Sequence, residues 1–193
     1  MLSEYNLNRK SNFGLIEVIC GSMFSGKTEE LIRRIKKAEH SKYKTIVFKP
    51  KIDSRSHGDY ILTHNNKRHD AFTVSNENTI LEKSKKYNVI GIDEAQFFSN
   101  LLVDTCNKLA NKGKRVIVAG LDMDFRGKPF GPMPNLMATA EFVSKLHAVC
   151  NQTGEMANYT NRKSKDKRKI KIGGDNEYEA LCRVSFFNKI NNE

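Results

Sequence analysis

The residues best suited to chemistry form the segment Gly-Ser-Met-Phe-Ser-Gly-Lys-Thr near the start of the chain. Its spacing matches G-x-x-x-x-G-K-[ST], a loop whose backbone N–H groups surround the phosphates of a nucleotide. In such loops the lysine reaches the outer phosphates and the final hydroxyl ligates Mg²⁺. An ordinary glycine turn is the alternative, but an apolar segment precedes the loop and helical periodicity follows it, as phosphate binding requires. The predicted phosphate-binding residues are Gly21, Ser22, Met23, Phe24, Ser25, Gly26, Lys27 and Thr28.

Two neighbouring carboxylates, Asp93 and Glu94, form the second candidate, directly after the apolar segment 88–92. A carboxylate at the end of a strand next to the phosphate loop can hold Mg²⁺, directly or through water. The following carboxylate points to another side of the chain and is free to accept a proton. Both acids could instead cap the next helix, but placement at a strand end favours a binding site. We therefore predict Asp93 at the metal and Glu94 as a proton acceptor.

Alternating strands and helices must position these motifs, and the apolar pattern predicts such elements. Strands are expected at 14–20, 44–48, 71–74, 88–92, 115–119 and 143–149. Helices are expected from Thr28, from a cap at Ser75 to about 86, from a cap at Ser99 to Gly113, and at 135–142. In the first helix, Arg33 and Arg34 are expected to face outward, opposite an apolar stripe. Continuous apolar strands that alternate with helices indicate an α/β fold with a mostly parallel sheet covered on both faces.

The length of 193 residues suits one domain with a small appendage. Apolar residues become sparse after Cys150, so we expect a flexible N-terminus at 1–13, a nucleotide-binding α/β domain at 14–149 and a small C-terminal module at 150–193. No apolar run approaches the ~20 residues that span a bilayer, and the polar start lacks a signal-peptide core. We therefore expect a cytoplasmic protein with no membrane partner. Four scattered cysteines are too few for a disulfide framework.

The formal charge of +11 raises the question of a nucleic-acid partner. Seven basic residues and one acid lie between Arg162 and Lys171, so more than half of the excess charge sits in one short segment. A solvated, mobile loop is the simpler interpretation of such a block, and attraction of a phosphorylated ligand is the functional one. Because the charge does not spread over a face, no nucleic-acid partner is expected.

Three motifs in this order resemble the thymidine kinase family of the cytosolic, tetrameric type (type II). They are the phosphate loop, the segment Asp-Glu-Ala-Gln-Phe-Phe at 93–98, and Gly-Leu-Asp-Met-Asp-Phe-Arg-Gly-Lys-Pro-Phe-Gly at 120–131. The resemblance runs from about Ile16 to Phe187. It implies a P-loop (RecA-like), mostly parallel sheet flanked by helices, and a C-terminal module with a nucleoside-binding lasso loop at about 158–178. It also implies transfer of the ATP γ-phosphate to the 5′-hydroxyl of thymidine, with Mg²⁺, in pyrimidine salvage for DNA synthesis, by a homotetramer that dTTP inhibits.

The same resemblance assigns roles to single residues. Glu94 matches the catalytic base, and Thr28 with Asp93 matches the magnesium position. Besides the loop, the residues that match the ATP site are Asp53, Arg55, Asp93 and Gln96. The residues that match the thymidine site are Met23, Phe97, Leu121, Phe125, Phe130, Thr160, Ile172, Gly173 and Tyr178. Without the resemblance, the aromatic residues in this set would be interpreted as core.

The chain departs from the family at its structural zinc site. The family usually binds zinc through two C-x-x-C-like pairs, but here Thr153 follows Cys150 and Ser185 follows Cys182 at that spacing. Structural zinc normally has four Cys or His ligands, so no structural zinc is expected. His147 lies close in sequence, but a histidine in a strand is the simpler interpretation.

Three other functions remain open at this point. The residues 93–96 also resemble a helicase D-E-A-x box, although the chain is too short for paired motor domains. A nucleotide-sensing module that docks a partner would need no base such as Glu94. A kinase for another nucleoside is close in chemistry, since deoxyuridine differs from thymidine by one methyl group, worth only ~1–3 kcal/mol of discrimination. We favour thymidine phosphorylation, with deoxyuridine as a possible second substrate.

Overall fold

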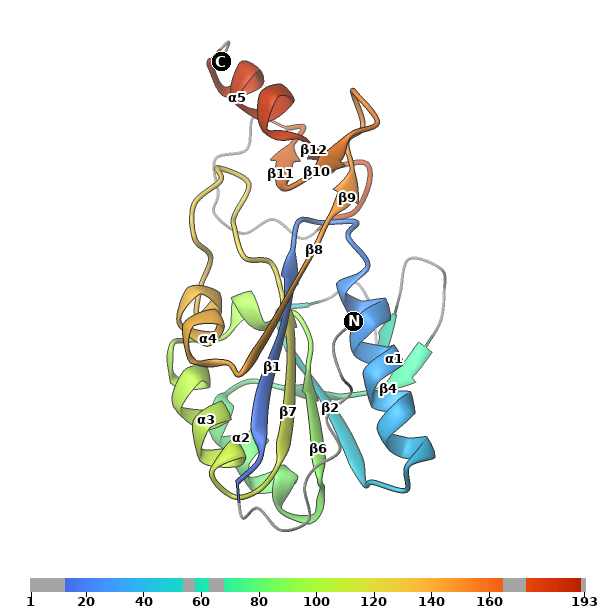
Figure 1. Ribbon diagram of the computed structural model, residues 1–193, viewed down its shortest axis with the longest axis vertical. Coiled ribbons are helices and arrows are strands. Elements are labelled where there is room, and N and C mark those ends of the chain that lie inside the picture. The colour runs from blue at the N-terminus through green and yellow to red at the C-terminus, as the bar shows by residue number, and fades with distance from the viewer. Residues whose placement is uncertain (1–12, 54–57, 63–67, 165–172, 192–193) are drawn as a thin grey trace.

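The computed structural model describes residues 13–53, 58–62, 68–164 and 173–191. Its centre is a six-stranded sheet in the order β5-β2-β6-β7-β1-β8, in which every neighbouring pair is parallel (Figure 1). The strands are β1 Leu15–Gly21, β2 Thr45–Pro50, β5 Phe72–Val74, β6 Val89–Ile92, β7 Arg115–Gly120 and β8 Phe142–Leu146. The predicted α/β fold with a parallel sheet is confirmed.

Helices cover both faces of this sheet, as Figure 1 shows. On one face lies α1 (Lys27–His40), whose buried stripe packs on β1, β2 and β7. On the other face lie α2 (Glu77–Lys83), α3 (Leu101–Ala110) and α4 (Met133–Thr139), which share the larger apolar core. Two 3-10 turns, Ser84–Lys86 and Ala95–Phe97, complete the helical elements of this part. Because both faces are covered, β1 is buried along its whole length, which explains its continuous apolar sequence.

Several helix boundaries differ from the sequence prediction, among them the N-cap of α3, which is Asn100 rather than Ser99. The α2 helix is capped by Asn76 rather than Ser75, because the Asn76 side chain accepts a hydrogen bond from the Thr79 N–H at 3.1 Å. The α4 helix begins at Met133 and ends at Thr139, so the prediction of a helix at 135–142 was wrong at both ends. A proline in the first helical turn needs no N–H partner, so Pro134 opens this helix instead of preceding it.

Several short elements had not been predicted. A hairpin of β3 (Tyr60–Leu62) and β4 (Arg68–Asp70) lies between β2 and β5 in sequence. Near the C-terminus, β9 (Ala148–Val149) pairs with β10 (Met156–Ala157), and β11 (Tyr159–Arg162) pairs with β12 (Tyr178–Leu181). The α5 helix (Arg183–Asn191) follows. No helix in the described ranges is long and apolar enough to cross a membrane.

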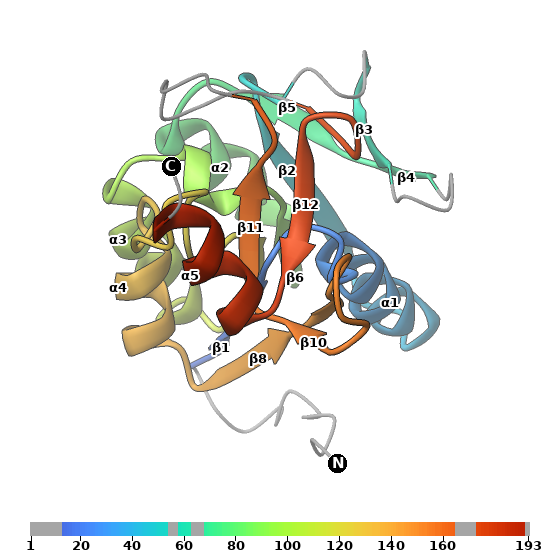
Figure 2. The same cartoon turned by 90° about the horizontal axis from the view of Figure 1, so that it is seen from above.

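The C-terminal elements sit over the carboxyl ends of the sheet strands. Figure 1 shows them above β1 and β8, and Figure 2 shows β11, β12 and α5 from above. They have an apolar cluster of their own, to which Phe24 of the phosphate loop and Met123 contribute from below. This apolar cluster of the C-terminal elements also reaches the phosphate loop. The expected boundary at residue 150 between the main domain and a C-terminal module therefore stays a prediction.

Arg34 is the clearest correction in the first helix. It was expected to face outward, but it is buried against the sheet, where it donates to Glu17 at 2.7 Å and to Glu30 at 2.8 Å. Arg115 also contacts the Glu17 carboxylate, at 2.5 Å. Glu17 lies in the middle of β1 and is buried, so its charge requires these guanidinium partners.

Replacing Arg34 by Met should lower the free energy of unfolding by about 2–4 kcal/mol, because Glu17 then stays buried with one guanidinium fewer. The neighbouring Arg33 has a 57% exposed side chain and pairs with Glu30 at the surface of the helix, so Arg33→Met should cost at most about 0.5 kcal/mol. Urea unfolding of both variants measures the difference. Equal destabilisation would mean that the Arg34–Glu17 pair contributes nothing specific.

Candidate active site

The predicted phosphate loop connects β1 directly to α1. Gly21 ends the strand and Gly26 is the left-handed residue before the helix, with φ values of 140° and 81°. A Cβ on Gly21 would lie 2.1 Å from the Leu146 carbonyl oxygen, so only glycine fits there. Lys27 Nζ donates to the Ser22 carbonyl oxygen at 2.6 Å, and Ser25 Oγ donates to the same oxygen at 2.8 Å. These bonds hold the lysine against the loop.

Thr28 and Asp93 meet at the carboxyl edge of the sheet. Thr28 Oγ1 lies 3.1 Å and 3.4 Å from the two Asp93 carboxylate oxygens. The Asp93 N–H donates to the Phe48 carbonyl oxygen at 2.9 Å, which fixes the chain as it leaves β6. A hydroxyl and a carboxylate in contact are the oxygen donors that Mg²⁺ prefers. The donor set therefore fits the predicted magnesium position.

Glu94 has an unusual backbone and a firmly held side chain. Its φ of 51° and ψ of 40° are left-handed, a conformation that costs energy for a residue other than glycine. Its carboxylate is buried and accepts a hydrogen bond from Gln96 Nε2 at 2.6 Å. The other end of the Gln96 amide accepts from the Leu121 N–H at 2.9 Å. One amide thus links the acidic pair to the loop after β7.

Two glycines that sequence reasoning had not singled out make room for Gln96, one for its amide and one for its backbone. A Cβ on Gly120 would lie 2.8 Å from Gln96 Oε1 and 2.7 Å from Met133 Sδ. Gly131 has a φ of 54°, and a Cβ there would lie 2.3 Å from the Gln96 carbonyl oxygen. Both glycines lie in the 120–131 motif, so the motif itself was the available signal.

The predicted aromatic residues fall into two groups. Phe97 and Phe130 meet edge to face, with ring centroids 5.8 Å apart. Phe125 lies elsewhere, under the guanidinium of Arg162 at 3.7 Å, and Arg162 also donates to the Tyr178 hydroxyl at 3.0 Å. Arg162 is buried in β11, so the prediction that it opens a solvated basic segment was wrong. Its cation is stabilised by the aromatic faces around it.

The C-terminal elements contact the phosphate loop directly. The Met23 N–H donates to Thr160 Oγ1 at 2.9 Å, and Ser22 Oγ donates to the Ala157 carbonyl oxygen at 3.5 Å. Thr160 is buried in β11. The structure therefore brings Thr160, from the predicted nucleoside site, onto Met23 of the predicted phosphate site.

Other predicted residues are only partly placed. Asp53 is buried just after β2, and its N–H donates to the Pro50 carbonyl oxygen at 3.0 Å. Gly173 lies before β12, close to Glu177. Arg55 and Ile172 lie outside the described residues. The sequence analysis did not single out Lys49. This lysine is 1% exposed at the carboxyl end of β2, next to Phe48, whose carbonyl oxygen accepts the hydrogen bond from the Asp93 N–H. A lysine inside an apolar strand was the sequence signal for it.

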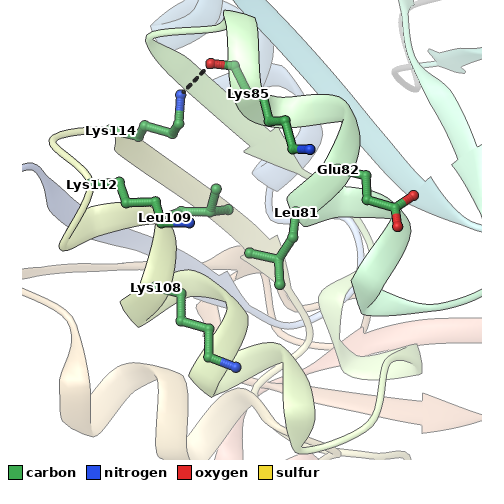
Figure 3. A pocket seen from close by; sticks show the side chains of 7 residues that line it. All are labelled: Leu81, Glu82, Lys85, Lys108, Leu109, Lys112 and Lys114. Carbon is green, nitrogen blue, oxygen red and sulfur yellow. Dashed lines mark hydrogen bonds between the residues drawn. The ribbon is translucent and has the colours of Figure 1, made fainter.

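A hollow of about 370 Å³ lies at the opposite end of the sheet and is not part of this site. It lies between α2 and α3, and Lys114 donates across it to the Lys85 carbonyl oxygen at 3.2 Å (Figure 3). Its lining residues are Leu81, Glu82, Lys85, Lys108, Leu109, Lys112 and Lys114.

The four positions that correspond to the family's zinc ligands converge in the C-terminal part. Ser185 Oγ lies 3.9 Å from Cys150 Sγ and 3.4 Å from Cys182 Sγ, and Thr153 Oγ1 lies 3.7 Å from Cys182 Sγ. Burial opposes ionisation of Cys150, but hydrogen bonds from the Thr153 hydroxyl and from nearby backbone N–H groups outweigh it and lower the pKa to about 6. In the described part of the chain, no three His, Cys, Asp or Glu side chains gather where they could hold a metal ion.

The chain is similar to known proteins over nearly its whole length. The family model described as Thymidine kinase matches residues 14–186. A thymidine kinase from Bacteroides fragilis (strain YCH46) is 48% identical over 187 residues, covering 96% of this chain and 94% of that protein. A thymidine kinase from Rhodothermus sp. (strain ITI 518) is 46% identical over 180 residues, covering 93% of this chain and 84% of that protein.

Two DNA replication initiation proteins of known structure are distantly similar to the chain. Domain III of the replication initiation protein DnaA from Thermotoga maritima superposes with a TM-score of 0.43 at 19% identity, covering 72% of this chain and 57% of that one. Such a likeness carries no information on function. The family match and the relatives each span nearly the whole chain. This chain belongs to the thymidine kinase family.

Proposed function

We propose that this chain transfers the γ-phosphoryl group of ATP to the 5′-hydroxyl of thymidine, forming dTMP. The observation that carries the proposal is the contact between Thr28 and Asp93, with Glu94 next to it and held by Gln96. Asp93, proposed for the metal, and Glu94, proposed as the base, are consecutive residues directly after β6. Phosphoryl transfer needs mainly such positioning and charge stabilisation.

Separate residues of the proposed site bind the phosphates and the metal ion. The loop amides and Lys27 bind the phosphates, and Thr28 with Asp93 would hold Mg²⁺, which supplies positive charge to the phosphate oxygens when bound. Asp53, Arg55 and Gln96 complete the proposed ATP site. Gln96 acts mainly by orienting the Glu94 carboxylate, since its amide donates to Glu94 Oε2.

Glu94 is the proposed general base. The 5′-hydroxyl of a sugar is a weak nucleophile, and a carboxylate within reach accepts its proton as the new bond to phosphorus forms. The bond from Gln96 Nε2 to Glu94 Oε2 orients the carboxylate for this task. The Glu94 carboxylate is bonded by Gln96 and that of Asp93 contacts Thr28, so the two neighbouring carboxylates have different partners.

The thymidine site is proposed at the junction of the phosphate loop and the C-terminal part. The apolar residues assigned to the base are Met23, Phe97, Leu121, Phe125 and Phe130. The residues assigned to the closing segment are Thr160, Ile172, Gly173 and Tyr178. The bond between Met23 and Thr160 supports this junction, because it ties the segment at 158–178 to the phosphate loop. A deoxyuridine ring would fit the same contacts apart from the methyl group.

Family membership extends the proposal to regulation and assembly. We propose a cytoplasmic homotetramer that dTTP inhibits, acting in pyrimidine salvage. The end product resembles the substrate nucleoside and also carries phosphates, so it could occupy both halves of the site described above.

Glu94→Gln should retain ATP binding but lower kcat by about 10²–10⁴-fold, because the amide cannot accept the hydroxyl proton. Steady-state assays with thymidine, ATP and Mg²⁺, together with calorimetric ATP titration, give both quantities. Glu82→Gln, in the hollow between α2 and α3, is the matched control and should leave kcat unchanged. An unchanged kcat in Glu94→Gln would remove Glu94 from the base role.

We further propose that the chain folds without structural zinc, since two of the four converging positions carry hydroxyls. Purified protein should contain far less than one zinc per chain after treatment with a chelator. The double variant Thr153→Cys with Ser185→Cys should then bind about one zinc per chain, because four thiols meet there. The control Thr153→Ser with Ser185→Thr should bind none. Near-stoichiometric zinc in the unmodified chain would contradict the proposal.

A further inference from the structure

Cys150 and Cys182 lie side by side beneath an exposed turn. Their sulfur atoms contact the same hydroxyl, that of Ser185, at 3.9 Å and 3.4 Å. The Cys150 sulfur also accepts a hydrogen bond from the backbone N–H of Cys182 itself. The Asn151 N–H donates to the Ala180 carbonyl oxygen, and the Ala180 N–H donates to Asn151 Oδ1. These two bonds hold the two segments in register. The two thiols are therefore neighbours across these paired segments.

The environment of this pair differs from that of the other two cysteines. Burial raises the pKa of Cys106 to about 12, and burial together with Asp122 raises that of Cys20 to about 11. Cys150 instead has a second thiol beside it, since its sulfur and that of Cys182 both contact Ser185 Oγ. The turn that covers the pair is exposed from Asn151 to Met156, so a small oxidant has a short path to the sulfur atoms.

We propose that Cys150 and Cys182 form a reversible oxidation site, in which a peroxide converts the two thiols into a disulfide. The Cys150 thiolate attacks one peroxide oxygen, so an S–O bond forms, the O–O bond breaks and hydroxide leaves. The Cys182 sulfur then attacks the sulfenic sulfur of Cys150, so the S–S bond forms, the S–O bond breaks and a second hydroxide leaves. Both hydroxides take up the thiol protons. Two thiols are thus oxidised, and hydrogen peroxide is reduced to two waters.

The disulfide would link the two ends of the segment that contains β11, the strand that contacts the phosphate loop. The cross-link would join the end of β9 to the end of β12 and enclose β11, whose Thr160 binds the Met23 N–H. Closing this loop restricts the unfolded chain, so oxidation should raise Tm by roughly 5–10 °C. Reduction by a dithiol should reverse the change.

The test uses the full chain, reduced, freed of reductant and treated with equimolar hydrogen peroxide. Peptide mapping by mass spectrometry without reductant should find one cross-linked pair of peptides, containing Cys150 and Cys182. Cys20 and Cys106 should remain open to alkylation after denaturation. Cys182→Ser should lose both the cross-link and the rise in Tm, and Cys106→Ala, the matched control, should keep both.

The mapping of the unmodified chain decides the outcome even if a variant fails to fold. Oxidation of Cys150 to a sulfenic or sulfinic acid without a cross-link would overturn the proposal. A disulfide that involves Cys20 or Cys106, or four thiols still free after treatment, would overturn it as well.

Discussion

The phosphate site depends on the contact between Thr28 and Asp93 at one edge of the sheet. The two residues follow strands that are not neighbours, since β7 lies between β1 and β6. They meet because parallel strands end at the same edge and because Gly21 and Gly26 let the chain turn back over that edge. Without this contact the loop and the acidic pair would be two separate motifs.

Several buried groups hold that edge together, and each has a specific partner. Glu94 is held by Gln96, and Gln96 in turn by the Leu121 N–H. The amide fits because Gly120 carries no Cβ, and the missing Cβ of Gly131 makes room for the Gln96 backbone. Burying a carboxylate is costly unless it accepts hydrogen bonds, so this arrangement both stabilises the charge and fixes its direction. The left-handed backbone at Glu94 is a further cost that the surrounding bonds offset.

The C-terminal part is held by packing as well as by the four converging side chains. Tyr159 stacks on Phe186 with ring centroids 4.5 Å apart, and the Arg162 guanidinium lies over the Phe125 ring. The contact between Arg162 and Phe125 joins the C-terminal elements to the loop after β7. Apolar and cation–π contacts therefore do much of the stabilising that a metal does in small domains built around one.

Much of the fold could be predicted from local sequence. The strand–loop–helix unit, the buried strands and the strand-end position of Asp93 follow from apolar periodicity and motif spacing, which are properties of neighbouring residues. The caps at Asn76 and the start of α4 were missed because serine, asparagine and proline each suit more than one helix-end position. The short strands β9 to β12 carry too few residues for a periodic signal.

The sequence by itself determined which residues are able to bind phosphate, hold Mg²⁺ or accept a proton, because those abilities belong to the side chains and their spacing. Only the tertiary structure decided which of them meet. It turned Arg34 and Arg162 inward, joined Thr160 to Met23, and brought Cys150 beside Cys182. These contacts join segments far apart in the chain, and no local pattern encodes the packing that brings such segments together.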